Sequence, residues 1–125
     1  MKIMGYAGMV VALGLAGPAL AHGEGDCVGF EELAAGDDFA ALAAIETSSF
    51  DDQDPAKLIN EAVALARTGQ TAAAQARFEA AARNAERVRL ETATGEWVDS
   101  RWLAMRGLVM IENGAFQQAV AMRSQ

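Results

Sequence analysis

Apolar residues recur every three to four positions along most of this chain, and this spacing constrains the possible folds more than any other feature. Alanine-rich segments of this kind follow one another from about residue 30 onward, and Gly36, Gly69 and Gly114 each lie between two of them. No period-2 alternation is sustained, and β-branched residues are sparse after position 21. The pattern therefore predicts an all-α fold without strands.

Helix-ending signals place the predicted helices. The clearest helix covers residues 55–68, because Asp54 suits the N-cap, Pro55 suits the first helical position and Gly69 suits the left-handed residue after the last turn. Residues 48–54 read as an acidic linker. We expect the other helices over 30–35, 38–47, 71–91, 96–113 and 115–125.

The first 21 residues have the layout of a secretory signal peptide. Lys2 gives a positive start, residues 3–21 carry no charge, and Ala19-Leu20-Ala21 follows a helix-breaking Pro18. We expect cleavage after Ala21 and a periplasmic or secreted protein with no stable membrane span after cleavage. Glycines interrupt the apolar run and weaken the alternative of an uncleaved membrane anchor.

Charge divides the rest of the chain. The 125 residues fit one domain and carry a net charge of −7, which excludes a default nucleic-acid binder. Residues 22–54 hold ten acids and no Lys or Arg, whereas residues 55–125 hold nine cations and seven acids. The expected organisation is a signal peptide over 1–21, an acidic tail with a short helical pair over 22–54, and helical hairpins over 55–125.

Residues suited to catalysis or metal binding are few. The single histidine and single cysteine, His22 and Cys27, leave no nucleophile with a base and an orienting group, so we expect no enzyme activity. Cleavage after Ala21 would make His22 the amino terminus, whose amine and imidazole can chelate Cu(II) with Cys27 close by. A small copper-handling protein is thus the alternative function. Cys27 otherwise stays a free thiol or forms an intermolecular disulfide.

The segments around Gly69 and Gly114 resemble tetratricopeptide repeats. Gly36 and Gly69 are 33 residues apart, close to the repeat length of about 34. The matching large, small and aromatic positions around Gly69 are Leu58, Ala62, Leu65, Ala74, Phe78 and Ala81. Around Gly114 the match is partial and comprises Leu103, Gly107, Met110, Phe116 and Ala119. Glu61, Glu86 and Arg106 depart from the pattern, and a generic helical bundle is the alternative.

The resemblance implies antiparallel helical hairpins that bind a protein or peptide partner on a concave face. That face would carry Ile59, Asn60, Val63, Arg67, Met105, Leu108 and Glu112, unless these residues pack against neighbouring helices instead. A last hairpin without a polar cap also leaves an apolar face open. We therefore expect self-association or docking through Phe116, Val120 and Met122.

The helical pattern also predicts the positions of two further pairs of residues. Trp97 and Trp102 are predicted to be core or boundary residues of the helix over 96–113. Arg83 and Arg87 are predicted to lie on a solvated face of the helix over 71–91.

Overall fold

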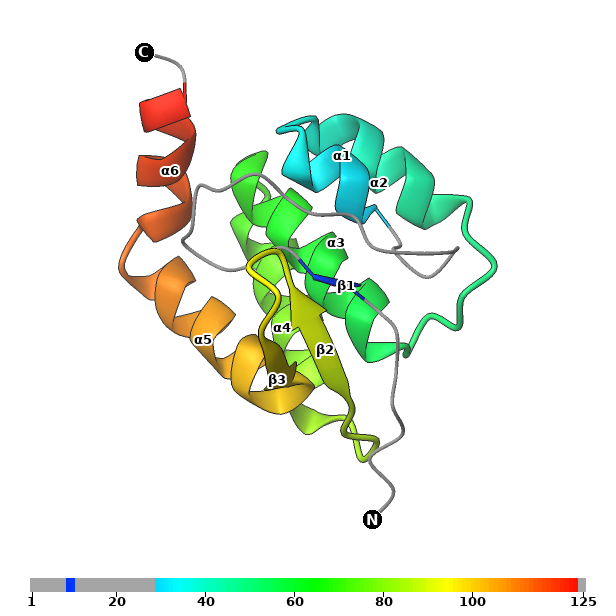
Figure 1. Ribbon diagram of the computed structural model, residues 1–125. Coiled ribbons are helices and arrows are strands. Elements are labelled where there is room, and N and C mark those ends of the chain that lie inside the picture. The colour runs from blue at the N-terminus through cyan, green and yellow to red at the C-terminus, as the bar shows by residue number, and fades with distance from the viewer. Residues whose placement is uncertain (1–8, 11–28, 124–125) are drawn as a thin grey trace.

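A computed structural model describes residues 9–10 and 29–123, and this part of the chain is mostly helical (Figure 1). The predicted helical character is therefore confirmed. Within the described residues, the helices are α1 (Phe30–Ala34), α2 (Asp38–Glu46), α3 (Pro55–Arg67), α4 (Thr71–Arg83), α5 (Ser100–Glu112) and α6 (Ala115–Arg123). The strands are β1 (Met9–Val10), β2 (Arg89–Thr92) and β3 (Trp97–Asp99).

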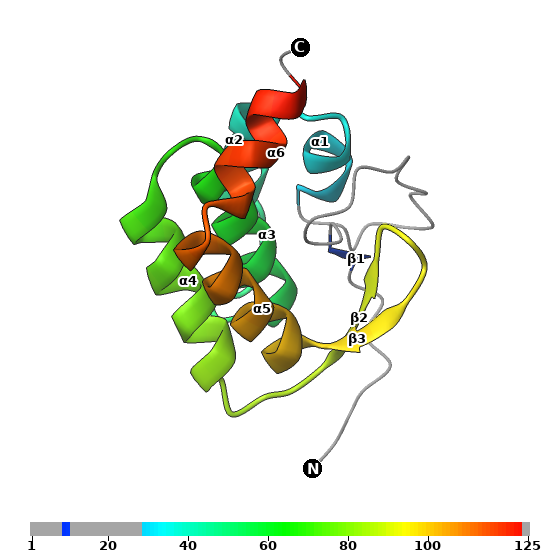
Figure 2. The ribbon, with the colours of Figure 1, turned by 90° about the vertical axis from the view of Figure 1, so that its left-hand side faces the viewer.

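Helix α3 lies at the centre of the fold, with α2, α4, α5 and α6 around it (Figure 2). Its start follows the sequence signals, because the Asp54 carboxylate accepts a hydrogen bond from the Lys57 backbone N–H and Pro55 occupies the first turn. Gly69 follows its end with φ +83°. Eleven of the 13 residues of α3 are buried, so this helix supplies much of the core.

The two predicted helices upstream of α3 are present. Helices α1 and α2 are separated by Gly36, which has φ +81°, a left-handed conformation that glycine adopts without strain. Asp37 caps α2 by accepting a hydrogen bond from the Ala40 N–H at 3.0 Å. Local signals are therefore sufficient to place both helices.

Helices α3 and α4 run antiparallel and pack side by side, and α5 packs against α4 (Figures 1 and 2). Phe78 of α4 is fully buried, and its ring lies where a Cβ on Gly107 of α5 would be placed. The same ring stacks with Phe116 of α6 at 6.1 Å between centroids. Phe78 thus joins three helices, and only a glycine at position 107 lets α5 come this close.

The prediction of a strand-free chain is wrong between residues 84 and 99. Helix α4 ends at Arg83 instead of continuing to residue 91, and the next helix begins at Ser100 instead of residue 96. Strands β2 and β3 form an antiparallel hairpin in between, with Leu90 opposite Val98. β1 adds to β2 in parallel, so the strand order is β1-β2-β3.

Burial along β2 explains why this segment is extended. Val88, Leu90 and Thr92 are buried, whereas Arg89 between them is exposed, so the chain buries alternate residues as a strand does. Gly95, with φ +84°, donates its N–H to the Thr92 carbonyl and closes the turn. An alternation of five residues was too short to outweigh the helical pattern on each side.

Helix α6 also departs from the expected arrangement. It does not fold back along α5, but runs on toward the end of the molecule where α1 and α2 lie (Figures 1 and 2). There Arg123 pairs with Asp38 of α2, and the Gln117 side chain donates to the Ala66 carbonyl of α3 at 3.3 Å. The antiparallel pairing seen for α3 and α4 is therefore not repeated by α5 and α6.

Of the predicted signal peptide, the structure describes only Met9 and Val10, and the rest lies outside the described residues. Among the described helices, none combines the length and apolar character needed to cross a bilayer.

Candidate interaction surface

The outward face of α5 carries large apolar side chains that are about half exposed. Trp102, Met105 and Val109 are 52%, 57% and 55% exposed, and their spacing puts them on one side of the helix. The opposite side of α5, which includes Leu103, Gly107 and Met110, is buried in the core. Helix α5 is thus apolar on two faces, and only one of them packs into the core.

A groove of about 620 Å³ lies where the β2–β3 hairpin meets the first turns of α5. Both of the chain's tryptophans line it, Trp97 from β3 at 43% exposure and Trp102 from α5. We call it the Trp–Arg groove. Its lining residues are Arg87, Arg89, Thr92, Glu96, Trp97, Val98, Asp99, Trp102, Leu103 and Arg106.

Asp99 fixes the geometry of this groove. One of its carboxylate oxygens accepts from Arg87 at 2.6 Å and the other from the Arg101 backbone N–H at 2.8 Å, which caps α5. Partial burial acts to raise the pKa of the Asp99 carboxyl, but the hydrogen bonds from Arg87, Arg101 and Trp102 outweigh it and hold that pKa below its usual value. Asp99 is therefore ionised at neutral pH and holds the hairpin to the helix.

Two arginines of the groove have no carboxylate partner in the described part of the chain. The Arg89 guanidinium donates to the Trp97 carbonyl at 3.0 Å, and the Arg106 guanidinium lies over the Trp102 ring at 5.4 Å from its centroid. Both side chains belong to exposed residues. The groove therefore offers two guanidinium groups beside two indole rings.

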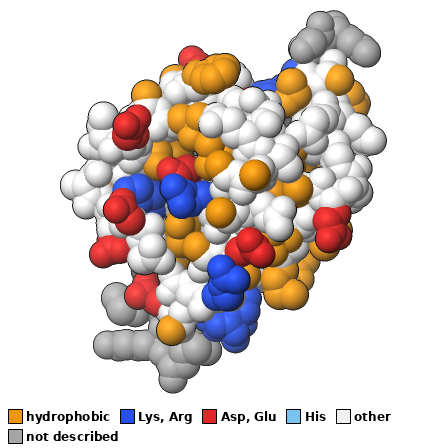
Figure 3. Space-filling view, turned by 180° about the vertical axis from the view of Figure 1, so that it is seen from behind, with side chains coloured by type: hydrophobic (Ala, Val, Ile, Leu, Met, Phe, Trp, Pro, Cys, Tyr) orange, Lys and Arg blue, Asp and Glu red, His pale blue; other side chains and the backbone are white. Residues whose placement is uncertain are grey.

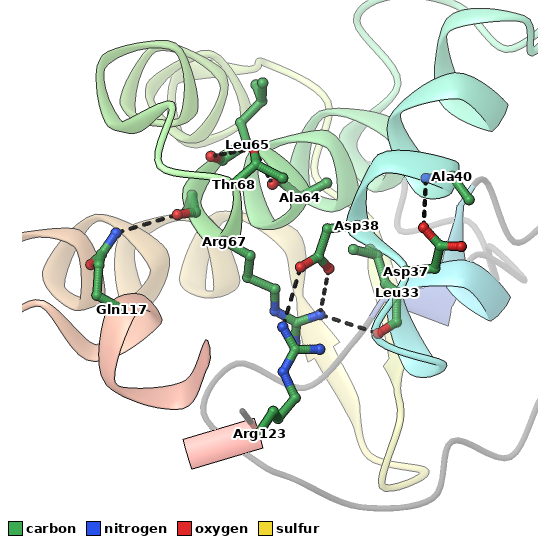
Figure 4. A network of polar contacts seen from close by, with 11 residues as sticks. Leu33, Asp37, Asp38, Ala40, Ala64, Leu65, Arg67, Thr68, Gln117 and Arg123 are labelled. Carbon is green, nitrogen blue, oxygen red and sulfur yellow. Dashed lines mark hydrogen bonds and ion pairs between the residues drawn. The ribbon is translucent and has the colours of Figure 1, made fainter. Parts of the chain in front are cut away.

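A second cluster of charges joins α2, α3 and α6 (Figure 4). The Asp38 carboxylate pairs with Arg67 at 3.3 Å and with Arg123 at 3.2 Å, and Arg67 also donates to the Leu33 carbonyl at 3.1 Å. Burial lowers the pKa of Arg67, while the charge of Asp38 and its hydrogen bond oppose that shift.

This cluster borders an open groove of about 750 Å³ that also includes Gly36, Phe39 and Val120. The side chains of Asp38 and Arg67 are only 9% and 13% exposed, and they neutralise each other. The cluster is therefore best explained as a clamp that holds α6 on α2 and α3.

On the face opposite to that of Figure 1, basic side chains lie beside acidic ones (Figure 3). Arg77 pairs with Glu61 between α4 and α3. Local neutralisation of this kind does not produce the basic surface that polyanions require.

The structure separates the predicted partner-binding residues instead of assembling them on one concave face. Ile59, Asn60 and Val63 are fully buried inside the molecule, so their assignment to a binding face is wrong. Arg67 belongs to the clamp with Asp38. Phe116 is 3% exposed against Phe78 and is a core residue. Of the remaining residues, Met105, Glu112 and Met122 are exposed, and Leu108 and Val120 are partly buried.

Sequence reasoning missed the Trp–Arg groove. Trp97 and Trp102 were expected to be core or boundary residues on one helix, but they come from a strand and a helix, and both are exposed. Arg87 likewise lies outside α4, in the segment that leads into β2. The alternation from Val88 to Thr92 was the one signal that could have separated the two tryptophans.

The predicted copper ligands, His22 and Cys27, lie outside the described residues. Within the described ranges, no three His, Cys, Asp or Glu side chains are placed to hold a metal ion.

The architecture is that of a mostly helical protein with a small sheet at one side. Compared with family models, curated proteins and solved structures, the chain matches none.

Proposed function

We propose that this protein is a non-catalytic protein–protein interaction module, and that α5 carries its docking surface. The observation on which this rests is the exposure of Trp102, Met105 and Val109 on one face of a helix whose other face is already in the core. Burying such a side chain fully is worth about 1.5–3 kcal/mol, so a partner that covers these half-exposed groups gains a substantial part of that from each. Contiguous apolar patches on soluble domains are typical of interaction sites.

A tetratricopeptide-like arrangement is part of this proposal. Its support is the antiparallel α3–α4 pair, with Gly69 at the turn and Phe78 packed between α4 and α5. The different course of α6 limits the resemblance to these three helices. Self-association through the C-terminal helix stays a prediction, and because Phe116 is buried it would depend on Met122 and Val120.

We also propose that residues 1–21 direct export and are removed, so that the protein acts in the periplasm or outside the cell. The support is the sequence pattern of Lys2, the uncharged run and Ala19-Leu20-Ala21. Amino-terminal sequencing of the protein recovered from the extracytoplasmic fraction should begin at His22. Recovery of the intact chain from the cytoplasm would refute export.

The docking surface is tested by affinity capture with the purified protein, a variant of the α5 face and a control variant on α4. Met105→Asp with Val109→Asp places two carboxylates on the exposed face of α5, whereas Gln75→Asp places one on the exposed face of α4. We expect partners recovered by the wild type and by Gln75→Asp to be lost with the α5 variant, while all three proteins keep the same helical circular dichroism. Equal recovery with all three would show that α5 is not the docking surface.

A further inference from the structure

We propose that the Trp–Arg groove binds an acidic peptide segment that carries an apolar or aromatic anchor residue. This inference rests on the proposed interaction function and names the chemistry of the partner. The groove brings together residues that are separate in the sequence, with Arg89 on β2, Trp97 on β3, and Trp102 and Arg106 on α5.

Charge is the first reason to expect an acidic ligand. Arg87 is already paired with Asp99, so within the groove the guanidinium groups left for a ligand are those of Arg89 and Arg106. A guanidinium presents its N–H donors in a planar fork that fits a carboxylate. Glu96 is the remaining acid in the lining, and it is exposed, so the groove keeps an excess of positive charge.

The indole rings are the second reason, because they require an apolar partner group. Trp97 and Trp102 together offer two large aromatic side chains that are 43% and 52% exposed. Aromatic and arginine residues in this combination are enriched among the residues that dominate binding energies at protein interfaces. An anchor side chain between or beside the indoles would gain apolar contact while the neighbouring carboxylates reach the arginines.

The shape of the surface favours a peptide segment. The apolar face of α5 continues from Trp102 to Met105 and Val109, beyond the residues that line the groove. By helix geometry, positions 102 and 109 are about 10 Å apart along the axis, which corresponds to three or more residues of an extended peptide. A nucleic acid would require a longer track of basic side chains than the two arginines, Arg89 and Arg106, that this groove offers.

The chain's two tryptophans both line the groove, so intrinsic fluorescence reports on its occupancy directly. The probe is an acetylated and amidated hexapeptide, Asp-Glu-Phe-Glu-Leu-Asp, and the control replaces its acids to give Asn-Gln-Phe-Gln-Leu-Asn. We expect the acidic peptide to produce a saturable change in tryptophan emission. The affinity derived from this change should weaken about tenfold from low salt to about 0.5 M salt. Binding of both peptides with the same affinity would overturn the proposal.

Calorimetry with variants tests the assigned residues. Arg89→Ala with Arg106→Ala should weaken binding of the acidic peptide about tenfold or more, because charged hydrogen-bond partners are removed. Arg83→Ala, an exposed arginine on α4 outside the groove, should leave the affinity unchanged. Unchanged unfolding midpoints establish that all variants are folded. The same affinity for the double variant and the wild type would refute the assignment.

Two outcomes separate this inference from the proposed function. If capture of partners depends on Met105 and Val109 but the acidic peptide does not bind, the docking surface stands and the acidic-peptide proposal fails. If tryptophan emission changes with the concentration of the protein alone and light scattering shows dimers, the occupant is a second copy of the chain. That result also overturns the proposal of a separate acidic peptide.

Discussion

Helices α3 and α5 are alike in length and in the way they begin, and they differ in their surroundings. Each has 13 residues, each begins after an aspartate whose carboxylate accepts a backbone N–H, and each carries an apolar stripe. Eleven residues of α3 are buried, against five of α5. Even Asn60 of α3 is fully buried, and the Lys57 side chain is 9% exposed while its amine donates to the Phe50 carbonyl and to Asp52.

The difference arises from position in the fold. Helix α3 is enclosed by α2, α4, α5 and α6, whereas α5 lies at the edge and packs with one side only. An apolar residue therefore stabilises the fold when it belongs to α3. On the outer face of α5 it adds little to the fold and is available to a partner. Four experiments test this contrast.

The largest effect is expected for a charge introduced into α3. Val63 is fully buried, so Val63→Asp would place a carboxylate in the core. We expect the free energy of unfolding to fall by more than about 4 kcal/mol, which leaves the chain largely unfolded. Val109 is 55% exposed, and Val109→Asp should change stability by no more than about 0.5 kcal/mol. Urea unfolding followed by circular dichroism measures both. Similar losses for the two variants would show that the outer face of α5 is not free.

The next effect concerns the end of α3. Asp38→Asn would leave the Arg67 guanidinium buried without its counter-charge, and we expect the free energy of unfolding to fall by about 3 kcal/mol. Arg123 is 39% exposed, so Arg123→Gln should cost about 1 kcal/mol or less. Equal costs measured by urea unfolding would mean that the network serves only to hold α6.

A third test addresses the inner face of α5. Gly107→Ala should destabilise the protein by about 1–2 kcal/mol, because the added methyl group overlaps the Phe78 ring, although alanine is the better helix former. The double variant with Phe78→Leu should show a smaller penalty for the same alanine, since the ring is no longer there. Independent, additive effects in this double-mutant cycle would contradict direct packing.

The smallest effect is the pH dependence at the start of α5. The pKa of Asp99 is lowered in the folded protein, so its contribution is complete above the unfolded carboxyl pKa of about 3.9 and is lost as pH falls through the lower folded value. Wild type should exceed Asp99→Asn in stability at pH 7, by about 1 kcal/mol or less, and the difference should vanish in strong acid. A constant difference at all pH values would show that Asp99 acts by shape and not by charge.

The local elements of this fold were predictable where short-range signals agree. Asp54, Pro55 and Gly69 set the limits of α3, and Gly36 separates α1 from α2, because caps and left-handed glycines act within a few residues. The prediction failed from Asn84 to Asp99. There Leu90 and Val98 pair within a short hairpin, but Val88 and Leu90 are buried in a core that is built mainly by helices distant in the chain.

The candidate site was less predictable than the helices. Ile59 and Val63, which the resemblance places on the binding face together with Met105, lie in the core, whereas Met105 is exposed. The spacing of an apolar stripe gives its face on the helix but not what that face contacts. Trp97 was misplaced for the same reason as the hairpin, because its strand was read as part of a helix.

Local signals along the chain are enough to predict its helical character, the limits of α3 and the turns at Gly36, Gly69 and Gly114, since these follow from backbone conformation and nearby hydrogen bonds. Contacts in the folded molecule determine which apolar stripes are buried, where the hairpin forms and how Trp97 meets Trp102. The physical reason is the distance along the chain over which each kind of interaction acts. Caps and turns are local, whereas burial depends on which elements, far apart in the chain, lie against each other in the folded molecule.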